Sequence, residues 1–320
     1  MSKVILLTTG GTIASAPNKE TGKLTSGALT GEELAAICDL PTDIDIVIES
    51  VFQKPSMHIT FQDYLHLKQR IEHHFQHDDV DGIVLTHGTD TLEETAYFLD
   101  LAIEDERPIV VTGSQRSPSD LGSDVFINLR HAIYSAQCKA LRHAGTVVVF
   151  NERIFAAKYV KKEHASNIQG FNVFGFGYLG IIDNDEVFVY QKPIKRDTYT
   201  VNQPLPRVDI VKCYINSDGI FVQAAIDAGA KGIILEGVGR GQVSPYMLEA
   251  IEKCVEKGIQ VVVTTSSEEG AVYTTYDYDG SAYDLVTKGV ILGSDYDSKK
   301  ARIKLAVMLA AGVQEFPPTL

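Results

Sequence analysis

The stretch VILLTTGGTIAS, residues 4–15, indicates the fold because a short apolar run passes directly into a turn with two glycines. An apolar run that does not alternate is typical of a strand covered on both faces, as in a parallel sheet. Similar runs recur at residues 82–85, 109–112, 147–150, 232–235 and 260–263. The sequence therefore predicts parallel sheets whose strands are joined by helices.

Three segments carry helical signals. Thr91 and Glu94 are spaced as a capping box, and one apolar stripe follows at Leu92, Ala96, Leu99 and Ile103. Two further helices are expected in the C-terminal third, over residues 245–257 and 298–311, and each is followed by a glycine.

The length of 320 residues favours two α/β domains. The stretch KRDTYTVNQPLPR, residues 195–207, has two prolines and no clear period, which is typical of a linker. We therefore predict an α/β protein with a larger N-terminal parallel-sheet domain, residues 1–194, and a smaller C-terminal α/β domain, residues 208–320.

The composition of the chain limits the kinds of molecule that the protein is expected to bind. The formal net charge is −13 and no run of Lys and Arg is present, so we expect no nucleic-acid partner. The apolar run ending at Leu7 is too short for a signal peptide or a membrane span, so we expect a cytoplasmic protein without membrane contact. The 4 cysteines lack zinc-ligand spacing and are expected to be reduced thiols.

The turn after the first strand can carry chemistry. Gly10 and Gly11 stand at a strand's carboxyl end, where ligands bind in open parallel sheets, and Thr12 follows them. Glycines let backbone N–H groups approach a substrate oxygen, and a hydroxyl there can attack a carbonyl carbon. A tight turn with a threonine cap explains the same pattern without any function.

A second such turn follows the next strand, in THGTDT, residues 86–91. Asp90 could pair with a substrate ammonium and Thr89 could relay a proton. The alternative is that Asp90 or Thr91 only caps the following helix. Two turns of this kind together favour a functional site.

These turns carry a resemblance. TGGTI at residues 9–13 and HGTDTLEETAYFLDL at residues 87–101 resemble the bacterial-type L-asparaginase family. Agreement extends along nearly the whole chain, at VTGSQRSPSDLGSD (111–124), GYLG (177–180), EGVGRG (236–241) and KKAR (299–302). The resemblance implies hydrolysis of L-asparagine to L-aspartate and ammonia through an acyl-threonine intermediate. It implies no cofactor, and a homodimer or a homotetramer of intimate dimers.

Carried over residue by residue, Thr12 resembles the family's nucleophile. Thr89, Asp90 and Lys162 resemble its second catalytic group, in which we expect Lys162 to serve as general base through Thr89. Asp90 is also expected to bind the substrate's α-amino group, and Ser56 its α-carboxylate. Backbone N–H groups near Gly11 and Thr89 are expected to form the oxyanion hole.

Other substrate-binding positions implied by the resemblance form the pocket wall: Gly11, Gly88 and Ser114. The chain also departs from the family. Many relatives carry a tyrosine in the loop after the nucleophile, but residues 14–31 contain none, although this polar stretch still resembles a mobile lid. Many relatives also take an asparagine and an acid from a partner subunit, where the nearest matches here are Gln242 and residues 282–284.

Several weaker patterns have simpler explanations. His73 and His77 are one helical turn apart but lack a third ligand, so we expect a solvated helix face and no metal site. Glycines at residues 237–241 do not complete a dinucleotide-binding loop, and we expect a turn. Residues 277–280 lack the full calcium-loop pattern, and we expect a hairpin turn.

Three other functions stay open at this point. A glutaminase-asparaginase differs from an asparaginase by one substrate methylene, which is typically worth only about 1–3 kcal/mol of discrimination. An amidotransferase subunit that releases ammonia usually has a further N-terminal domain, and TGGTI here begins at Thr9. A non-catalytic amino-acid sensor is disfavoured because Thr12, Thr89, Asp90 and Lys162 are all retained.

Overall fold

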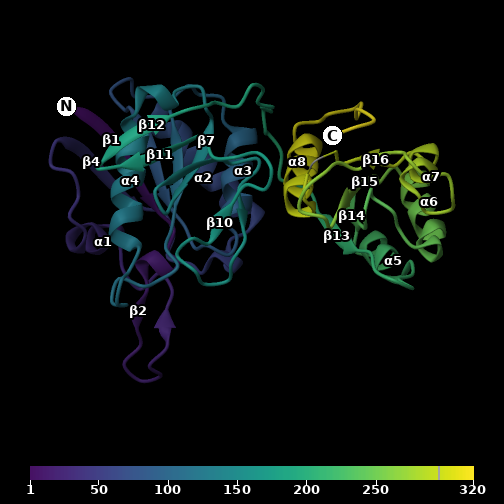
Figure 1. Ribbon diagram of the computed structural model, residues 1–320, viewed down its shortest axis with the longest axis horizontal. Helices are drawn as coiled ribbons and strands as arrows, with labels where there is room; N and C mark the ends of the chain where they lie inside the picture. Colours follow the sequence, from purple (N-terminus) through teal and green to yellow (C-terminus); the bar gives the residue numbers. More distant parts are fainter. Residues whose placement is uncertain (295) are drawn as a thin grey trace. The chain divides into compact units, whose positions relative to one another are not determined.

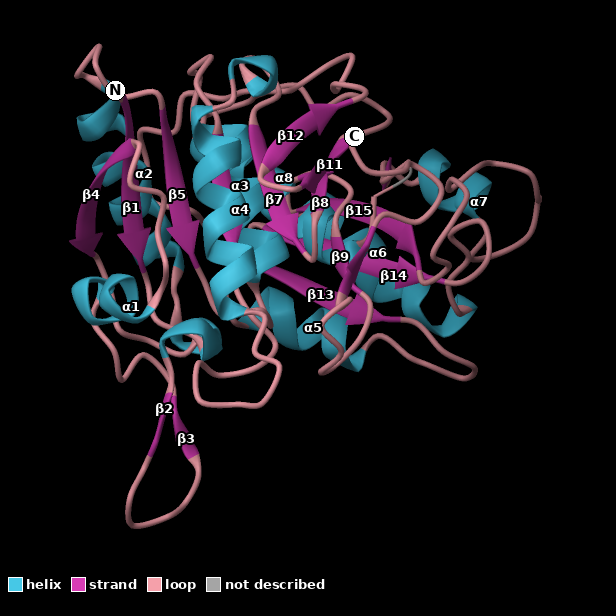
Figure 2. Cartoon of the chain, turned by 60° about the vertical axis from the view of Figure 1, so that its left-hand side comes forward, coloured by secondary structure: helices cyan, strands magenta, loops and turns pink. Residues whose placement is uncertain are grey.

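The structure, a computed structural model, describes residues 1–294 and 296–320. The chain divides into a larger unit, Met1–Thr198, and a smaller unit, Tyr199–Leu320. Each unit has its own sheet dominated by parallel strands and flanked by helices (Figures 1 and 2). The predicted fold class, a larger parallel-sheet domain followed by a smaller α/β domain, is confirmed. Residues 195–207 contain neither helix nor strand.

The larger unit is built on an 8-stranded sheet in the order β12-β11-β8-β7-β6-β5-β1-β4. Five neighbouring strands are parallel: β4 (Ile44–Ser50), β1 (Ser2–Thr8), β5 (Gly82–Thr86), β6 (Ile109–Thr112) and β7 (Thr146–Phe150). Four of them contain the apolar runs predicted to be strands. The remaining strands are antiparallel: β8 (Arg153–Ala156), β11 (Gly180–Asp183) and β12 (Glu186–Val189).

Helices cover both faces of this sheet. Val4 and Leu6 of β1 point into a core formed with α1 (Gly31–Ile37) and α4 (Val125–Gln137). On the other face lie α2 (Phe61–Phe75) and α3 (Leu92–Ala102), whose Tyr64 and Phe98 rings stack at 4.8 Å. This two-sided cover explains why the parallel strands are apolar without alternation.

The predicted helix after β5 is confirmed, but its predicted capping box is wrong. Leu92, Ala96 and Leu99 are buried as the stripe requires. Thr91 is the N-cap of α3, yet its side chain makes no capping hydrogen bond. Its hydroxyl instead donates to the backbone carbonyl of Ser56 at 3.1 Å. A tertiary partner has displaced the local one.

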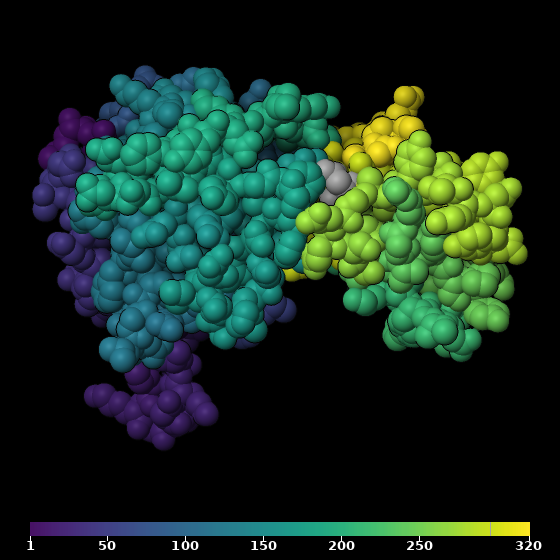
Figure 3. All heavy atoms as spheres, in the orientation of Figure 1, coloured from purple at the N-terminus to yellow at the C-terminus, as the bar shows by residue number. Residues whose placement is uncertain are grey.

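Short elements surround the carboxyl edge of the sheet: η1 (Thr12–Ala14), β2 (Ala16–Pro17), β3 (Leu24–Thr25), η2 (Ser56–His58), β9 (Lys161–Lys162) and β10 (Phe171–Asn172). A further short helix, η3 (Lys139–Leu141), lies between α4 and β7. Strands β2 and β3 form an antiparallel hairpin. This hairpin projects from the body of the larger unit (Figures 2 and 3). The polar stretch after Thr12 therefore has regular structure of its own, and its role as a lid stays a prediction.

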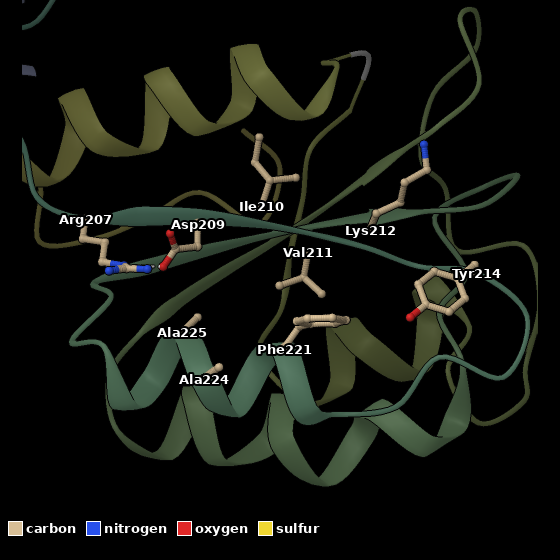
Figure 4. Close-up of a pocket in the computed structure, with 9 residues that line it drawn as sticks. All are labelled: Arg207, Asp209, Ile210, Val211, Lys212, Tyr214, Phe221, Ala224 and Ala225. Carbon is tan, nitrogen blue, oxygen red and sulfur yellow. Dashed lines mark hydrogen bonds and ion pairs between the residues drawn. The ribbon is translucent and has the colours of Figure 1, made fainter. Parts of the chain in front are cut away.

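The smaller unit has a fully parallel sheet in the order β13 (Val208–Lys212), β14 (Gly232–Gly237), β15 (Gln260–Thr265) and β16 (Ile291–Leu292). Its helical elements are α5 (Ile220–Asp227), η4 (Pro245–Met247), α6 (Leu248–Glu256), α7 (Ala282–Thr287) and α8 (Ser298–Ala310). Figure 4 shows β13 between α8 on one face and α5 on the other.

Both helices predicted for the C-terminal third are confirmed, the first as η4 followed by α6 and the second as α8. The hairpin turn expected at residues 277–280 is wrong, because the turn there leads into α7, which Ser281 caps. The turn expected at residues 237–241 is present. Within residues 1–294 and 296–320, no helix is long and apolar enough to cross a membrane.

Candidate active site

The turns after β1 and β5 pack backbone against backbone. The two strands are neighbours, with Thr8 opposite Thr86. Gly11 has a φ of 85°, and a Cβ atom on it would lie 2.5 Å from both the Cα and the N of Gly88. No side chain fits there, so the glycine is required by this close approach as well as by its backbone conformation.

A third segment, the η2 turn, closes on the same place. A Cβ atom on Gly88 would lie 2.9 Å from the Cβ and the Oγ of Ser56, which is itself buried. The hydrogen bond from Thr91 to the Ser56 carbonyl holds this segment against the start of α3. Gly11, Gly88 and Ser56 therefore come together from three parts of the chain.

Thr12 begins the short η1 helix and is half-buried. In the part of the chain that the structure describes, its hydroxyl has no hydrogen-bond partner. The same holds for the backbone N–H groups of Gly11, Thr12, Gly88 and Thr89. The paired turns thus present a hydroxyl beside several uncommitted N–H donors, which is the arrangement that acyl transfer requires.

Lys162 brings a charge to this edge. Its Nζ donates to Thr89 Oγ1 at 2.8 Å and to Asp90 Oδ1 at 2.7 Å. The lysine side chain is only 13% exposed, whereas that of Asp90 is 64% exposed. The backbone N–H of Lys162 donates to the carboxylate of Glu93, which is fully buried in α3. The lysine is thus fixed from both ends, while the aspartate is open to solvent.

The turn after β6 supplies the next contacts. Ser114 is buried, and its hydroxyl donates to the Arg116 carbonyl at 2.6 Å, within its own turn. The adjacent Gln115 accepts a hydrogen bond from Thr89 Oγ1 at 3.2 Å. Sequence reasoning did not single out Gln115, although its place just beyond the carboxyl end of a parallel strand was a usable signal.

His87, also missed in the sequence, supports the second turn from behind. Its Nδ1 donates to the Gly88 carbonyl at 2.8 Å and its Nε2 accepts from Thr95 Oγ1 at 2.9 Å. Complete burial lowers the pKa of His87 to about 4, which keeps the ring neutral at physiological pH. A neutral ring with one donor and one acceptor satisfies both neighbours and fixes the Gly88 turn.

Thiol and metal chemistry have less support. Burial raises the pKa of the Cys213 thiol to about 12 and those of Cys38 and Cys254 to about 11, so these groups are poor nucleophiles at neutral pH. His73 and His77 are exposed and stack edge to face at 5.9 Å. Across residues 1–294 and 296–320, no group of three or more metal-ligating side chains is found.

The smaller unit has a pocket of about 370 Å³ between β13 and α5 (Figure 4). Arg207 and Asp209 form an ion pair of 2.6 Å at one end, and Phe221 lies under Val211. These walls offer no hydroxyl or thiol paired with a base. The chemistry is therefore expected in the larger unit.

Comparison with known proteins identifies the family. Residues 3–195 match the model described as "Asparaginase, N-terminal", and residues 207–315 match "Glutaminase/Asparaginase C-terminal domain". The chain belongs to the asparaginase family.

Individual asparaginase-family proteins align with nearly the whole length of this chain. An L-asparaginase of Bacillus licheniformis is 65% identical over 97% of this chain and 96% of its own length. A glutaminase-asparaginase of Pseudomonas fluorescens is 33% identical over 97% of this chain and 86% of its own. The crystal structure of a probable cytoplasmic L-asparaginase from Campylobacter jejuni superposes with a TM-score of 0.88 at 31% identity, covering 99% of this chain and 97% of that one.

The structure brings most residues expected from the asparaginase resemblance to one edge of the larger sheet: Gly11, Thr12, Ser56, Gly88, Thr89, Asp90 and Lys162. Ser114 lies in the neighbouring turn, with its hydroxyl committed to Arg116. Gln242 and Ala282 lie in the smaller unit, where Gln242 Oε1 accepts from the Ala282 N–H at 2.9 Å. The catalytic roles of these residues remain predictions.

Proposed function

We propose that this chain is an L-asparaginase that hydrolyses the side-chain amide of L-asparagine to L-aspartate and ammonia through a covalent ester on Thr12. The observation that carries the proposal is the pairing of the uncommitted Thr12 hydroxyl with uncommitted N–H groups on two facing glycine turns. Family membership and the 65% identical L-asparaginase support the choice of substrate.

In the proposed reaction, Thr12 Oγ attacks the amide carbon and forms a tetrahedral intermediate. The N–H groups of Gly11 and Thr89 stabilise the negative oxygen. The C–N bond then breaks, ammonia leaves with the proton taken from Thr12, and a β-aspartyl ester remains. Water attacks the ester, and aspartate leaves as Thr12 regains its proton. This chemistry requires no cofactor.

Substrate recognition is assigned to the charged ends of the amino acid. Asp90 binds the α-ammonium, since its carboxylate is mostly exposed and a charge-assisted bond is strong and directional. Ser56 binds the α-carboxylate, and Gly11, Gly88 and Ser114 form the wall. Lys162 serves as general base through Thr89, which its Nζ contacts at 2.8 Å.

We also propose a homo-oligomer, either a dimer or a tetramer of intimate dimers, that resides in the cytoplasm. The location is supported by the name of the Campylobacter jejuni relative, a probable cytoplasmic L-asparaginase.

Ammonia release on mixing with L-asparagine and with L-glutamine tests the activity. We expect kcat/KM to be larger for asparagine, and comparable values would redefine the protein as a glutaminase-asparaginase. Intact-mass analysis of an acid-quenched reaction should show the β-aspartyl adduct, and peptide mapping should place it on Thr12. An adduct on Thr89 would reverse the assignment of the nucleophile.

A further inference from the structure

Lys162 is held by its backbone as well as by its side chain. Its N–H donates to the carboxylate of Glu93, whose side chain is completely buried. Lys162 lies in β9, which pairs with β10. The next N–H along the chain, that of Glu163, donates to the Gly170 carbonyl at 2.8 Å, on the β10 side. The Lys162 N–H therefore lies on the outer side of this pair of strands, where Glu93 supplies the acceptor that a third strand would otherwise provide.

One short segment contacts Lys162 at both of its ends. Thr89 and Asp90, which accept hydrogen bonds from Nζ, lie in the turn before α3. Glu93, which accepts the hydrogen bond from the backbone, is the second residue of α3. This helix is buried along most of its length, which fixes it in the larger unit. The distance between the anchored backbone of the lysine and the Thr89 hydroxyl is thus set within residues 89–93.

The ion pair with Asp90 cannot hold the lysine through the whole proposed reaction. A general base is neutral before it takes a proton, and a neutral amine is not attracted to a carboxylate as a cation is. The proposed substrate also brings an ammonium group that competes for Asp90. The hydrogen bond to Glu93 is made by the backbone of Lys162, so it does not depend on the charge of Nζ. It can therefore persist when the ion pair weakens.

We propose that Glu93 is a positioning residue that fixes the backbone of Lys162 and so keeps Nζ within reach of Thr89 in both protonation states of the lysine. This inference rests on the proposed function, in which Lys162 receives through Thr89 the proton that leaves Thr12, and later a proton of water. Glu93 itself takes no proton and touches no reactant. Its effect on rate is geometric, because a displacement of about 1 Å can cost about 10²-fold in an enzyme.

Two conservative variants separate position from charge. Glu93→Asp keeps the carboxylate but shortens the side chain by one methylene, which draws the acceptor away from the Lys162 N–H. Glu93→Gln keeps the length and one acceptor oxygen and removes the charge. We expect kcat to fall about tenfold or more in Glu93→Asp, with KM for asparagine changed less than about threefold, and to stay within about threefold in Glu93→Gln. Equal losses, or a larger loss in Glu93→Gln, would overturn the proposal.

Glu94→Asp is the matched control. Glu94 occupies the next position in the first turn of α3 and is only partly buried. The variant makes the same chemical change in the same turn and leaves Glu93 in place. Its kcat should stay within about twofold of wild type. An equal loss in Glu94→Asp and Glu93→Asp would mean that the start of α3, and not the bond to Lys162, determines the activity.

A double-mutant cycle with Lys162→Met tests whether Glu93 acts through the lysine. Methionine keeps the backbone N–H at this position and removes the amine. In that background, with slow turnover followed over hours, Glu93→Asp should cause no further loss of kcat. An undiminished loss would contradict the proposal.

Amide hydrogen exchange at Lys162 gives a readout that needs no activity. Its N–H should exchange at least about tenfold faster in Glu93→Asp than in wild type or in Glu93→Gln, because a hydrogen-bonded amide is protected until it opens. Equal exchange in the three proteins would mean that Glu93 does not hold this N–H. If wild type releases no ammonia from asparagine, the proposed function fails, and the exchange measurement still decides whether Glu93 fixes Lys162.

Discussion

The two sheets of this protein make similar turns and use them differently. In both units a parallel strand, β1 or β14, ends in a turn with two glycines at positive φ. In the smaller unit the turn is closed on itself, because Val238 and Gln242 exchange backbone hydrogen bonds of 2.9 Å. In the larger unit the N–H groups of Gly11 and Thr12 have no partner in the described residues. Glycine content alone does not mark a site, but uncommitted donors do.

The carboxyl edges of the two sheets also differ in the exposure of their ion pairs. Lys162 contacts Asp90 at 2.7 Å and Lys212 contacts Glu236 at 3.0 Å, so both edges hold an ion pair. The side chain of Lys162 is 13% exposed and that of Lys212 is 70% exposed. A lysine withdrawn from water and held against a hydroxyl can move protons, whereas a solvated one only balances charge.

Removal of the proposed nucleophile should give the largest difference in kcat between variants at the carboxyl edges of the two sheets. Thr12→Ala should fold normally and lose about 10⁴-fold or more in kcat, as removal of a nucleophile does. The matched variant is Thr265→Ala, which removes a hydroxyl at the end of β15 that donates to the Gly239 carbonyl at 2.7 Å. It should cost about 1 kcal/mol of unfolding free energy and leave kcat within about twofold. Ammonia assays and denaturant unfolding measure both, and a Thr12→Ala enzyme within tenfold of wild type would remove the proposed mechanism.

The lysines provide the next contrast. Lys162→Met should lower kcat about 10³-fold and still bind aspartate, because general-base catalysis typically contributes 10²–10⁴-fold. Lys212→Met should keep kcat within about twofold. Calorimetric titration with aspartate, next to the ammonia assay, checks binding. If Lys162 served only to neutralise Asp90, its removal would chiefly destabilise the fold and a stable variant would keep near-normal kcat.

Glycine substitutions test the packing of the turns. Gly11→Ala forces a Cβ atom to within 2.5 Å of Gly88, and we expect kcat/KM to fall about 10²-fold as the hydroxyl is displaced. Gly239→Ala is the control, since its φ is also positive, at 54°, but nothing lies within 4 Å of the added atom. It should lose about 1 kcal/mol of stability and no activity. If both variants lowered kcat/KM equally, backbone strain, and not the contact with Gly88, would explain the loss of activity.

Much of this architecture could be predicted because its signals are local. The apolar runs of β1, β5, β6, β7, β14 and β15 stand out because both faces of each strand are covered. Among the strands that no run predicted, β8, β11 and β12 form one side of the larger sheet, and β12 is partly exposed. A half-solvated strand of four residues carries too weak a pattern to be separated from a loop.

Only part of the candidate site could be predicted from the sequence, because several of its residues lie far apart along the chain. Thr12, Thr89 and Asp90 lie in glycine-containing turns directly after apolar strands, and this pattern is visible in the sequence. Lys162 is 73 residues from Thr89 and was assigned to the site by family resemblance alone. Gln115 and His87 act through side-chain contacts that no spacing rule encodes. Thr91 shows the opposite case. Its spacing to Glu94 predicted a capping box, but its hydroxyl instead bonds to the Ser56 carbonyl, 35 residues away. Thr91 owes its role to a tertiary contact, whereas His87 contacts only Gly88 and Thr95 in a geometry that residue spacing does not reveal.

Acid stability should also distinguish the two units. All 9 histidines lie at or before His164, hence in the larger unit. Burial lowers the pKa of His87 to about 4, whereas in the unfolded chain it titrates near 6.5. The unfolded state therefore binds a proton first as pH falls, and the folded protein loses up to about 1.4 kcal/mol of stability per pH unit between about 6.5 and 4. His87→Gln should flatten this part of the curve of unfolding free energy against pH, whatever its effect at pH 7. The exposed His143 gives the control, and His143→Gln should leave the slope as in wild type. An unchanged slope in His87→Gln would mean that the buried ring is not what makes the Gly88 turn acid-sensitive.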